Sequence, residues 1–350
     1  MIIDEIETPG WAKIVRAQDP KRGLDALVAV HDATLGPGCG GVRMHPYGSV
    51  EDALEDVKNL SRGMTYKNAI GGIPFGGGKS VIIGNPHQDK TQALFEAFGE
   101  VLNSLDGLYY TAEDAGVTED DMISVAAITK YAAGFRRGDI GGDPSPFTAR
   151  GVWRGIEAAV SARLGRDDLK GVSVCILGVG AVGMALGEHL HGAGAVLTVA
   201  DIHEASLAEA KEKFGAEIIS PEAAHAANVD VYAPCALGGA VNDKTFPEIN
   251  AAIIAGAANN QLAEPHFDAD LRARNILYAP DFVINAAGVI SVGLEITGRW
   301  NQDEMERRID AIGDRLRALF ERAEREGRPT GEIADAMAEE IIAAGAQKYG

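Results

Sequence analysis

The chain has 350 residues, and 46% of them are hydrophobic, which is enough for the cores of two domains. Its formal net charge of −19 at pH 7 argues against nucleic acid and against an anionic membrane surface as partners. The three cysteines are far apart and form no CxxC pair, so neither a disulfide framework nor a metal site is predicted. The acidic N-terminus lacks a signal-type apolar core and no run is long enough for a membrane span, so we expect a cytoplasmic protein.

The first 140 residues have the pattern of an α/β domain. Apolar runs predict strands at 26–31, 80–83 and 108–111, and helical periodicity predicts helices at 49–62, 91–104 and 118–131. Segment 136–146 is rich in Gly, Asp and Pro, which is typical of a linker. We therefore expect a first domain over residues 1–140 that holds the substrate.

The remainder predicts a second α/β domain over residues 141–325. A helix is expected at 148–164, and further strands at 229–233, 253–256 and 276–278. Asn301 and Glu304 resemble a capping box before a helix with a regular apolar stripe. A last helix near 332–344, in the segment 326–350, is expected to return to the first domain or to contact a neighbouring subunit.

The most informative motif is a glycine turn between two apolar runs. Gly178, Gly180 and Gly183 form GxGxxG, followed by a helical pattern and a second apolar run that ends at Asp201. The glycines allow a tight turn, close approach of a pyrophosphate and close packing of the helix, whose N-terminus faces the anion. Asp201, 23 residues after Gly178, lies where a carboxylate accepts ribose hydroxyls. The pattern predicts a Rossmann domain, and the acid favours NAD over NADP.

A second glycine-rich segment, residues 71–80, surrounds Lys79. Gly-Lys-Ser suggests a P-loop, but a P-loop has glycine six residues before its lysine, where this chain has Ile73. An apolar strand also follows Lys79, whereas a P-loop continues into a helix. Partial burial or a second cation, for which Lys67 is a candidate, would lower the pKa of such a lysine and make it a usable base.

Motifs along nearly the whole chain resemble the glutamate, leucine, phenylalanine and valine dehydrogenase family. The motifs are LGPGCGGVRM (35–44), GMTYKNA (63–69), FGGGKS (75–80), TAEDAG (111–116), GDPSPFTARGV (142–152), GVGAVG (178–183), APCALGG (233–239), GAANNQL (256–262) and APDFVINAAGVI (279–290). The resemblance implies a substrate domain, a Rossmann domain with a cleft between them, and reversible NAD-dependent oxidative deamination of an L-amino acid to a 2-oxo acid. We also expect a homo-oligomer.

The resemblance also implies roles for individual residues. Lys67 would bind the substrate carboxylate, Lys79 would be the general base that activates water, and Asp114 would relay protons to and from the substrate nitrogen. Asn260 and Asn285 align with family asparagines near the substrate and the nicotinamide. The residues expected to line the cofactor are Thr148, Gly178, Val179, Gly180, Ala181, Val182, Gly183, Asp201, Ala236, Leu237, Ala257, Ala258, Asn259 and Asn260.

The substrate is expected to be apolar. Glutamate dehydrogenases of the family carry a lysine where this chain has Cys39, and a serine where it has Val292. A buried γ-carboxylate without a partner costs several kcal/mol, so glutamate is disfavoured. The expected pocket consists of Cys39, Met64, Ala112, Val289 and Val292. Leucine, valine and isoleucine are the first choice and phenylalanine the second, while a catalytically silent NAD-binding regulator remains an alternative.

Overall fold

The computed structural model describes residues 1–138 and 140–349; residues 139 and 350, in the expected linker and C-terminal segment, lie outside this description. The chain forms two compact units, which are described separately. Unit 1 comprises residues 1–142, 289–302 and 338–350, and unit 2 comprises residues 143–288 and 303–337. The predicted fold class, two α/β domains of which the second is a Rossmann domain, is confirmed. No helix of the described residues is long and apolar enough to cross a membrane.

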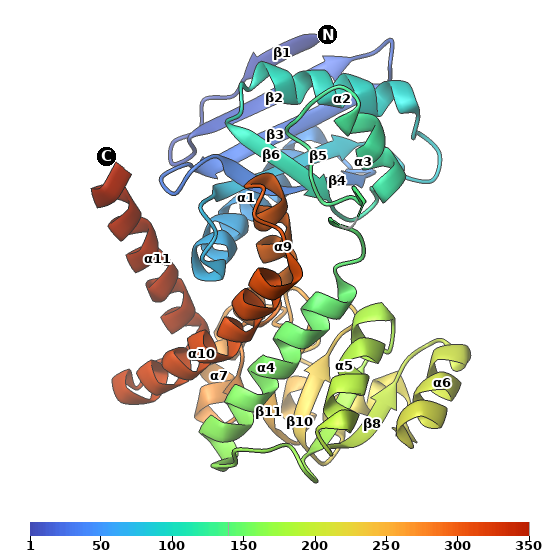
Figure 1. Cartoon of the computed structure of the whole chain (residues 1–350), viewed down its shortest axis with the longest axis vertical. Coiled ribbons are helices and arrows are strands. Elements are labelled where there is room, and N and C mark those ends of the chain that lie inside the picture. The colour runs from blue at the N-terminus through green and yellow to red at the C-terminus, as the bar shows by residue number, and fades with distance from the viewer. Residues whose placement is uncertain (139, 350) are drawn as a thin grey trace. The chain divides into compact units, whose positions relative to one another are not determined.

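Unit 1 is built on a mixed six-stranded sheet (Figure 1). Its elements are β1 (Ile2–Glu5), β2 (Lys13–Asp19), β3 (Leu24–Asp32), β4 (Gly38–His45), α1 (Val50–Gly71), β5 (Gly76–Ile83), α2 (Gln92–Ser104), β6 (Tyr109–Glu113), α3 (Glu119–Ala126), most of α9 (Ala287–Ile296) and the end of α11 (Thr330–Tyr349). The strand order is β1-β2-β3-β5-β4-β6, and β4 runs parallel to both β5 and β6. The carboxyl ends of these three strands therefore meet at one edge of the sheet.

Successive side chains of a strand point to opposite faces of the sheet. The buried apolar side chains of unit 1 therefore form two cores, one on each face. On one face, Val81 packs with Ala53 and Val57 of α1. On the other face, Ile82 packs with a larger cluster that includes residues of α2 and α3. Lys79 is two residues before Val81 and therefore points to the α1 face.

Three helices of unit 1, α1, α2 and α3, begin at side-chain caps. The hydroxyls of Ser49 and Thr91 accept the N–H groups of Asp52 and Leu94 at 3.0 and 3.1 Å, as N-caps do. Thr118 forms a reciprocal capping box with Asp121. Helix α3 ends at Ala126, earlier than predicted, because the chain at residues 131–133 hydrogen-bonds alongside Thr111 of β6.

Unit 2 contains a six-stranded sheet in which every pair is parallel. Its elements are α4 (Ser145–Leu164), β7 (Ser173–Leu177), α5 (Ala181–Gly192), β8 (Val196–Ala200), α6 (Glu204–Phe214), β9 (Glu217–Ile218), η1 (Pro221–Ala226), β10 (Val229–Pro234), η2 (Phe246–Glu248), β11 (Ala251–Ile254), α7 (His266–Ala273), β12 (Leu277–Tyr278), α8 (Asp281–Ile284), α10 (Gln302–Glu326) and the start of α11. The order β12-β11-β10-β7-β8-β9 is that of a dinucleotide-binding sheet, with its switch point between β7 and β10.

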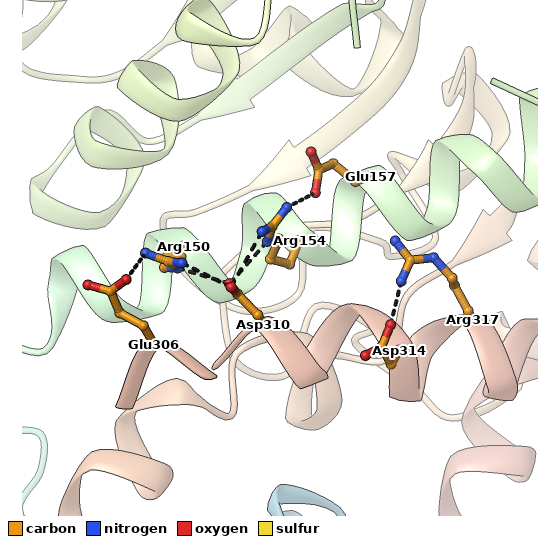
Figure 2. Close-up of polar contacts among 7 residues, drawn as sticks. All are labelled: Arg150, Arg154, Glu157, Glu306, Asp310, Asp314 and Arg317. Atoms are coloured by element: carbon orange, nitrogen blue, oxygen red, sulfur yellow. Dashed lines mark hydrogen bonds and ion pairs between the residues drawn. The ribbon is translucent and has the colours of Figure 1, made fainter. Parts of the chain in front are cut away.

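An ion-pair cluster joins α4 to α10 within unit 2 (Figure 2). The Nε atoms of Arg150 and Arg154 lie 2.9 and 3.0 Å from Asp310 Oδ1. Glu306 and Glu157 accept from the same two arginines, each at 2.8 Å. Hydrogen bonds from Arg150 outweigh the effect of burial and lower the pKa of Asp310 to about 2. The cluster fixes α4, whose first turn carries Thr148.

Candidate functional site

Lys79 lies in the middle of β5 with its side chain buried. The residue is 5% exposed, and its Nζ is 3.1 Å from Oδ2 of Asp114, which directly follows β6. The strand begins at Gly76 rather than near Ser80, so the glycines before Lys79 belong to the sheet. A P-loop requires a loop that enters a helix at this point, and the structure therefore excludes that alternative.

The glycines around Lys79 are required by close packing. A Cβ on Gly77 would lie 1.9 Å from Thr65 Oγ1, so α1 can approach the strand only because the side chain is absent. A Cβ on Gly40 would lie 1.9 Å from the carbonyl oxygen of Gly78, on the neighbouring strand. Glycine in a strand interior marks such close approaches. The glycine-rich sequence thus brings α1, β4 and β5 together around the lysine.

The Lys79–Asp114 pair is electrostatically poised for proton transfer. Burial lowers the pKa of Lys79 below its ordinary value, although the negative charge of Asp114 acts in the opposite direction. Burial would raise the pKa of Asp114, but the positive charges of Lys79 and Arg43 outweigh it, and the pKa is lowered. The result is a buried amine that loses its proton more easily than usual, beside a carboxylate that stays ionised.

Arg43 was not singled out as a site residue from the sequence. Its Nε donates to Asp114 Oδ2 at 3.0 Å, and its Nη1 donates to Asp56 Oδ2 at 3.1 Å. Tyr47 donates to the same Asp56 oxygen at 2.5 Å. The only sequence signal for Arg43 is its place in the family motif 35–44.

Lys67 lies half-buried on the last turns of α1, in the same unit as Lys79 and Asp114. The residues of the expected apolar pocket also lie in unit 1. Cys39 and Ala112 are buried on the neighbouring strands β4 and β6, and burial raises the pKa of the Cys39 thiol to about 12. Met64 Cγ is 3.2 Å from the position that a Cβ on Gly40 would occupy.

Val289 and Val292 are half-buried on α9, one turn apart, and thus face the same side of that helix. Val289 Cγ2 lies 3.5 Å from the position that a Cβ on Gly71, at the end of α1, would occupy. The family-derived pocket residues therefore come from β4, β6, α1 and α9. Their role in binding a substrate stays a prediction.

Glu295, one turn after Val292 on α9, is a charged neighbour that the sequence did not indicate. Its Oε2 accepts the N–H of Gly134 at 2.9 Å, while its buried Oε1 has no hydrogen-bond partner among the described residues. Burial raises the pKa of Glu295, and its charge contributes to the raised pKa of Cys39. A Cβ on Gly134 would lie 2.9 Å from the Ala112 Cβ, so Glu295 lies beside the apolar residues.

In unit 2, the glycine turn has the shape that a pyrophosphate requires. Gly178 has a φ of +97°, and a Cβ on Gly183 would lie 1.9 Å from the Gly178 carbonyl oxygen, so α5 lies directly against the turn. A Cβ on Gly180 would meet nothing within 4 Å, which leaves open space at the N-terminus of α5. These residues fit the phosphates of a dinucleotide.

Asp201 follows β8 and is held by two backbone groups. The N–H of Val179 donates to its Oδ2 and the N–H of His203 to its Oδ1, each at 2.8 Å. Each carboxylate oxygen keeps a second lone pair, so the fixed Asp201 can still accept ribose hydroxyls. This arrangement fits the adenosine ribose of NAD and disfavours an additional phosphate.

Two more loops reach the carboxyl edge of the unit 2 sheet. Ala236, after β10, approaches Gly178 so closely that a Cβ there would lie 2.7 Å from the Ala236 Cβ, and the next residue, Leu237, is exposed. In the loop after β11, Ala257 O and Asn259 Oδ1 accept hydrogen bonds at 3.0 and 2.7 Å from Asn285, which follows α8. Asn260 adopts a left-handed φ of +51°. The expected cofactor residues of both loops thus lie at the edge where α/β sheets bind ligands.

Comparison with known proteins agrees with this architecture. A family model described as the Glu/Leu/Phe/Val dehydrogenase dimerisation domain matches residues 12–131, and one described as glutamate/leucine/phenylalanine/valine dehydrogenase matches residues 200–349. The chain belongs to this family. It is therefore an amino-acid dehydrogenase, an oxidoreductase with NAD as its cofactor.

Relatives are similar over nearly the whole chain but differ in the amino acid named. Leucine dehydrogenase of Geobacillus stearothermophilus is 46% identical over 339 residues, 96% of this chain and 92% of that protein. Phenylalanine dehydrogenase of Bacillus thermotolerans is 42% identical, covering 95% and 88%. The crystal structure of L-tryptophan dehydrogenase from Nostoc punctiforme has a TM-score of 0.86 at 40% identity, covering 96% and 97%.

Proposed function

We propose that the chain catalyses reversible oxidative deamination of branched aliphatic L-amino acids, of the leucine, valine and isoleucine type, to the 2-oxo acid, ammonia and NADH. The observation that carries this proposal is the buried Lys79–Asp114 pair, with its 3.1 Å contact. A catalytically silent NAD-binding regulator has no need to keep a lysine buried at the cost of its charge. The pair therefore favours an enzyme over a regulator.

The side chains of unit 1 supply positioning and proton transfer. Lys67 binds the substrate carboxylate and so fixes the orientation of the amino acid. NAD, held by the glycine turn and Asp201 of unit 2, would supply the acceptor for the hydride that leaves the substrate Cα. Lys79, as its free amine, takes a proton from the water that attacks the resulting imino carbon. Asp114 exchanges protons with the substrate nitrogen, so that ammonia can leave when the carbinolamine collapses to the 2-oxo acid.

The choice of an aliphatic substrate rests on the surroundings of Cys39. This residue is 2% exposed and its raised pKa keeps the thiol neutral, so it presents an apolar surface. Glu295 adds a negative charge near Cys39, which would repel the carboxylate of a glutamate side chain bound there. Repulsion and the missing cation both disfavour acidic substrates. The leucine dehydrogenase of Geobacillus stearothermophilus, at 46% identity, supports the same choice.

An aromatic substrate is the second candidate. The relatives named phenylalanine and tryptophan dehydrogenase are 42% and 40% identical, close to the value for leucine dehydrogenase. A difference of one methylene in an apolar pocket changes selectivity only about 10–200-fold. Small changes in pocket volume at Met64 or Val292 can therefore decide between the two classes.

The deciding experiment is a comparison of kcat/KM across amino acids. The purified protein is assayed for NADH formation with L-leucine, L-valine, L-isoleucine, L-phenylalanine, L-tryptophan and L-glutamate. We expect the branched aliphatic substrates to give the highest kcat/KM and glutamate to give negligible turnover. Preference for glutamate would contradict the pocket, whereas preference for an aromatic substrate would replace only the aliphatic assignment.

We further propose a cytoplasmic homo-oligomer that associates through unit 1. Strand β1 lies at the edge of its sheet with Ile2 and Ile3 exposed, and open sheet edges pair readily with other chains. The family model that matches residues 12–131 is described as a dimerisation domain. Light scattering of the purified chain tests the oligomeric state, and a monomeric mass would contradict the proposed homo-oligomer.

A further inference from the structure

Arg43 connects two carboxylates at the carboxyl edge of the unit 1 sheet. Its Nε binds Asp114 at 3.0 Å and its Nη1 binds Asp56, on α1, at 3.1 Å. The Asp114 oxygen that Arg43 contacts is Oδ2, the same atom that Lys79 approaches to 3.1 Å. Asp114 is therefore shared by two cations, of which only Lys79 can give up its proton at an ordinary pH.

Asp56, the second carboxylate that Arg43 binds, is also held in place. Tyr47, which follows β4, donates to Asp56 Oδ2 at 2.5 Å, so the carboxylate that holds Arg43 is itself held. Arg43, Tyr47 and Asp56 also line a cleft of about 940 Å³. A guanidinium has its donors in a rigid planar fork, which suits it to bridge two fixed carboxylates in a way that a lysine cannot reproduce.

The charges that face Lys79 act in opposite directions. From β4, Arg43 lowers the pKa of Lys79, whereas Asp114 after β6 and Asp56 on α1 raise it, and burial is the largest influence of all. The Cys39 thiol on β4 also faces it, but burial raises the pKa of that thiol to about 12 and keeps it uncharged. Arg43 additionally lowers the pKa of Asp114. Without Arg43, the Lys79 ammonium would be the one remaining cation of the two that bind Asp114.

We propose that Arg43 is the positioning residue of the acid–base pair: anchored by Asp56 and Tyr47, it fixes the Asp114 carboxylate beside Lys79 and prevents an exclusive Asp114–Lys79 ion pair. The inference rests on the proposed roles of Lys79 and Asp114. Arg43 acts through Asp114 and is not assigned a contact with the substrate. Its loss should affect turnover and its pH dependence more than the binding of NAD, whose residues lie in unit 2.

The test compares pH profiles of kcat/KM for L-leucine in Arg43→Met and Asp114→Asn. Arg43→Met removes a positive charge that lowers the pKa of Lys79, so the ascending limb of the pH profile should move to higher pH. Because Asp114 is misplaced as well, kcat should fall roughly 10- to 100-fold. Asp114→Asn removes a negative charge, so the limb of its residual activity should move to lower pH. A merely structural role for Arg43 predicts no such opposite displacement.

Arg16→Met is the matched control. Arg16 is also in unit 1, 29% exposed against 28% for Arg43, and pairs with Asp25 at 2.7 Å. It lies on β2, which β3 separates from the strand of Lys79, and its replacement should leave both kcat and the ascending limb of the pH profile unchanged. If Arg43→Met does not fold, Arg43→Lys replaces it: the charge is kept, so the limb should stay in place while kcat falls because one ammonium cannot hold both carboxylates.

A kcat within about twofold of wild type for Arg43→Met, with an unmoved limb, would overturn the proposal, as would full activity of Arg43→Lys when only that variant folds. Lys79→Ala is measured in parallel. If Lys79→Ala stays active, the proposed function of Lys79 fails. If Lys79→Ala is inactive and the Arg43 variants resemble wild type, only the role of Arg43 fails.

Discussion

Replacing Cys39 by lysine should suppress turnover of leucine. Cys39 is 2% exposed, and the nearby charges are the Lys79 ammonium, which would repel the new cation, and the Glu295 carboxylate, which would attract it. Burying an ammonium group costs several kcal/mol when it is incompletely paired. If about 3 kcal/mol of this cost appears in the transition state, kcat/KM for L-leucine falls roughly 100-fold.

Glutamate should gain little from the same change, because Glu295 is available to pair with the introduced ammonium. Combining Cys39→Lys with Glu295→Gln removes that partner, and the double variant should use L-glutamate better than the single variant does. Cys39→Ala is the neutral control and should keep leucine kcat/KM within about tenfold of wild type, since it changes volume but not charge.

The assay is the initial rate of NADH formation over a range of each amino acid, with thermal unfolding measured to confirm that every variant is folded. Leucine kcat/KM of Cys39→Lys within about threefold of wild type would show that Cys39 does not line the substrate pocket. Equal kcat/KM for L-glutamate in the single and double variants would show that Glu295 does not face the substrate pocket.

Three further predictions concern cofactor choice, acid stability and packing. Asp201→Ala should increase kcat/KM with NADP relative to NAD, because a carboxylate that repels a 2′-phosphate is removed; an unchanged ratio would refute this. The lowered pKa of Asp310, about 2, implies stability that is present above the ordinary carboxyl pKa and lost as pH falls through about 2. Asp310→Asn should thus be less stable than wild type at neutral pH by about 1 kcal/mol, since the side chain is 34% exposed, and this difference should disappear in denaturant titrations as the pH falls through about 2. Gly77→Ala should destabilise by about 1–3 kcal/mol or more, because the new Cβ would lie 1.9 Å from Thr65 Oγ1. Gly63→Ala, at a helical position with nothing within 4 Å, should stabilise by about 0.5–1 kcal/mol in the same measurement.

The Rossmann unit could be predicted from sequence because its signals are local. The turn, helix and acid from Gly178 to Asp201 lie within one continuous segment, and the structure has β7, α5 and β8 there. The three helices predicted to begin at residues 49, 91 and 118 do begin there, at the structural N-caps Ser49, Thr91 and Thr118. Such signals depend on a few neighbouring residues and not on the rest of the fold.

Strand β4 and helix α9 were missed for a physical reason. Gly38–His45 contains three glycines, which intrinsic propensity disfavours in strands, and it is a strand because β5 and β6 pair with it on both sides. For the same reason β5 was predicted to start near residue 80, whereas it starts at Gly76. In α9 (Ala287–Ile296), two glycines weaken the helical pattern.

These omissions also hid parts of the site. Arg43 lies on β4, and its partners Asp56 and Asp114 are 13 and 71 residues away, so no local pattern joins them. Glu295 lies on α9, and its contact with Gly134 spans 161 residues. Lys79 was singled out from its glycine-rich segment and Asp114 from a family motif, but their 3.1 Å pairing and the degree to which Lys79 is buried follow only from the folded sheet.

The variant Lys79→Ala tests most directly whether Lys79 is the base of this NAD-dependent amino-acid dehydrogenase. NADH formation from L-leucine is measured together with the dissociation constant for NAD. A general base contributes roughly 10²–10⁴-fold, so kcat should fall by that factor, while NAD affinity should be retained because the glycine turn and Asp201 belong to unit 2. Turnover within about tenfold of wild type, with NAD still bound, would contradict the account.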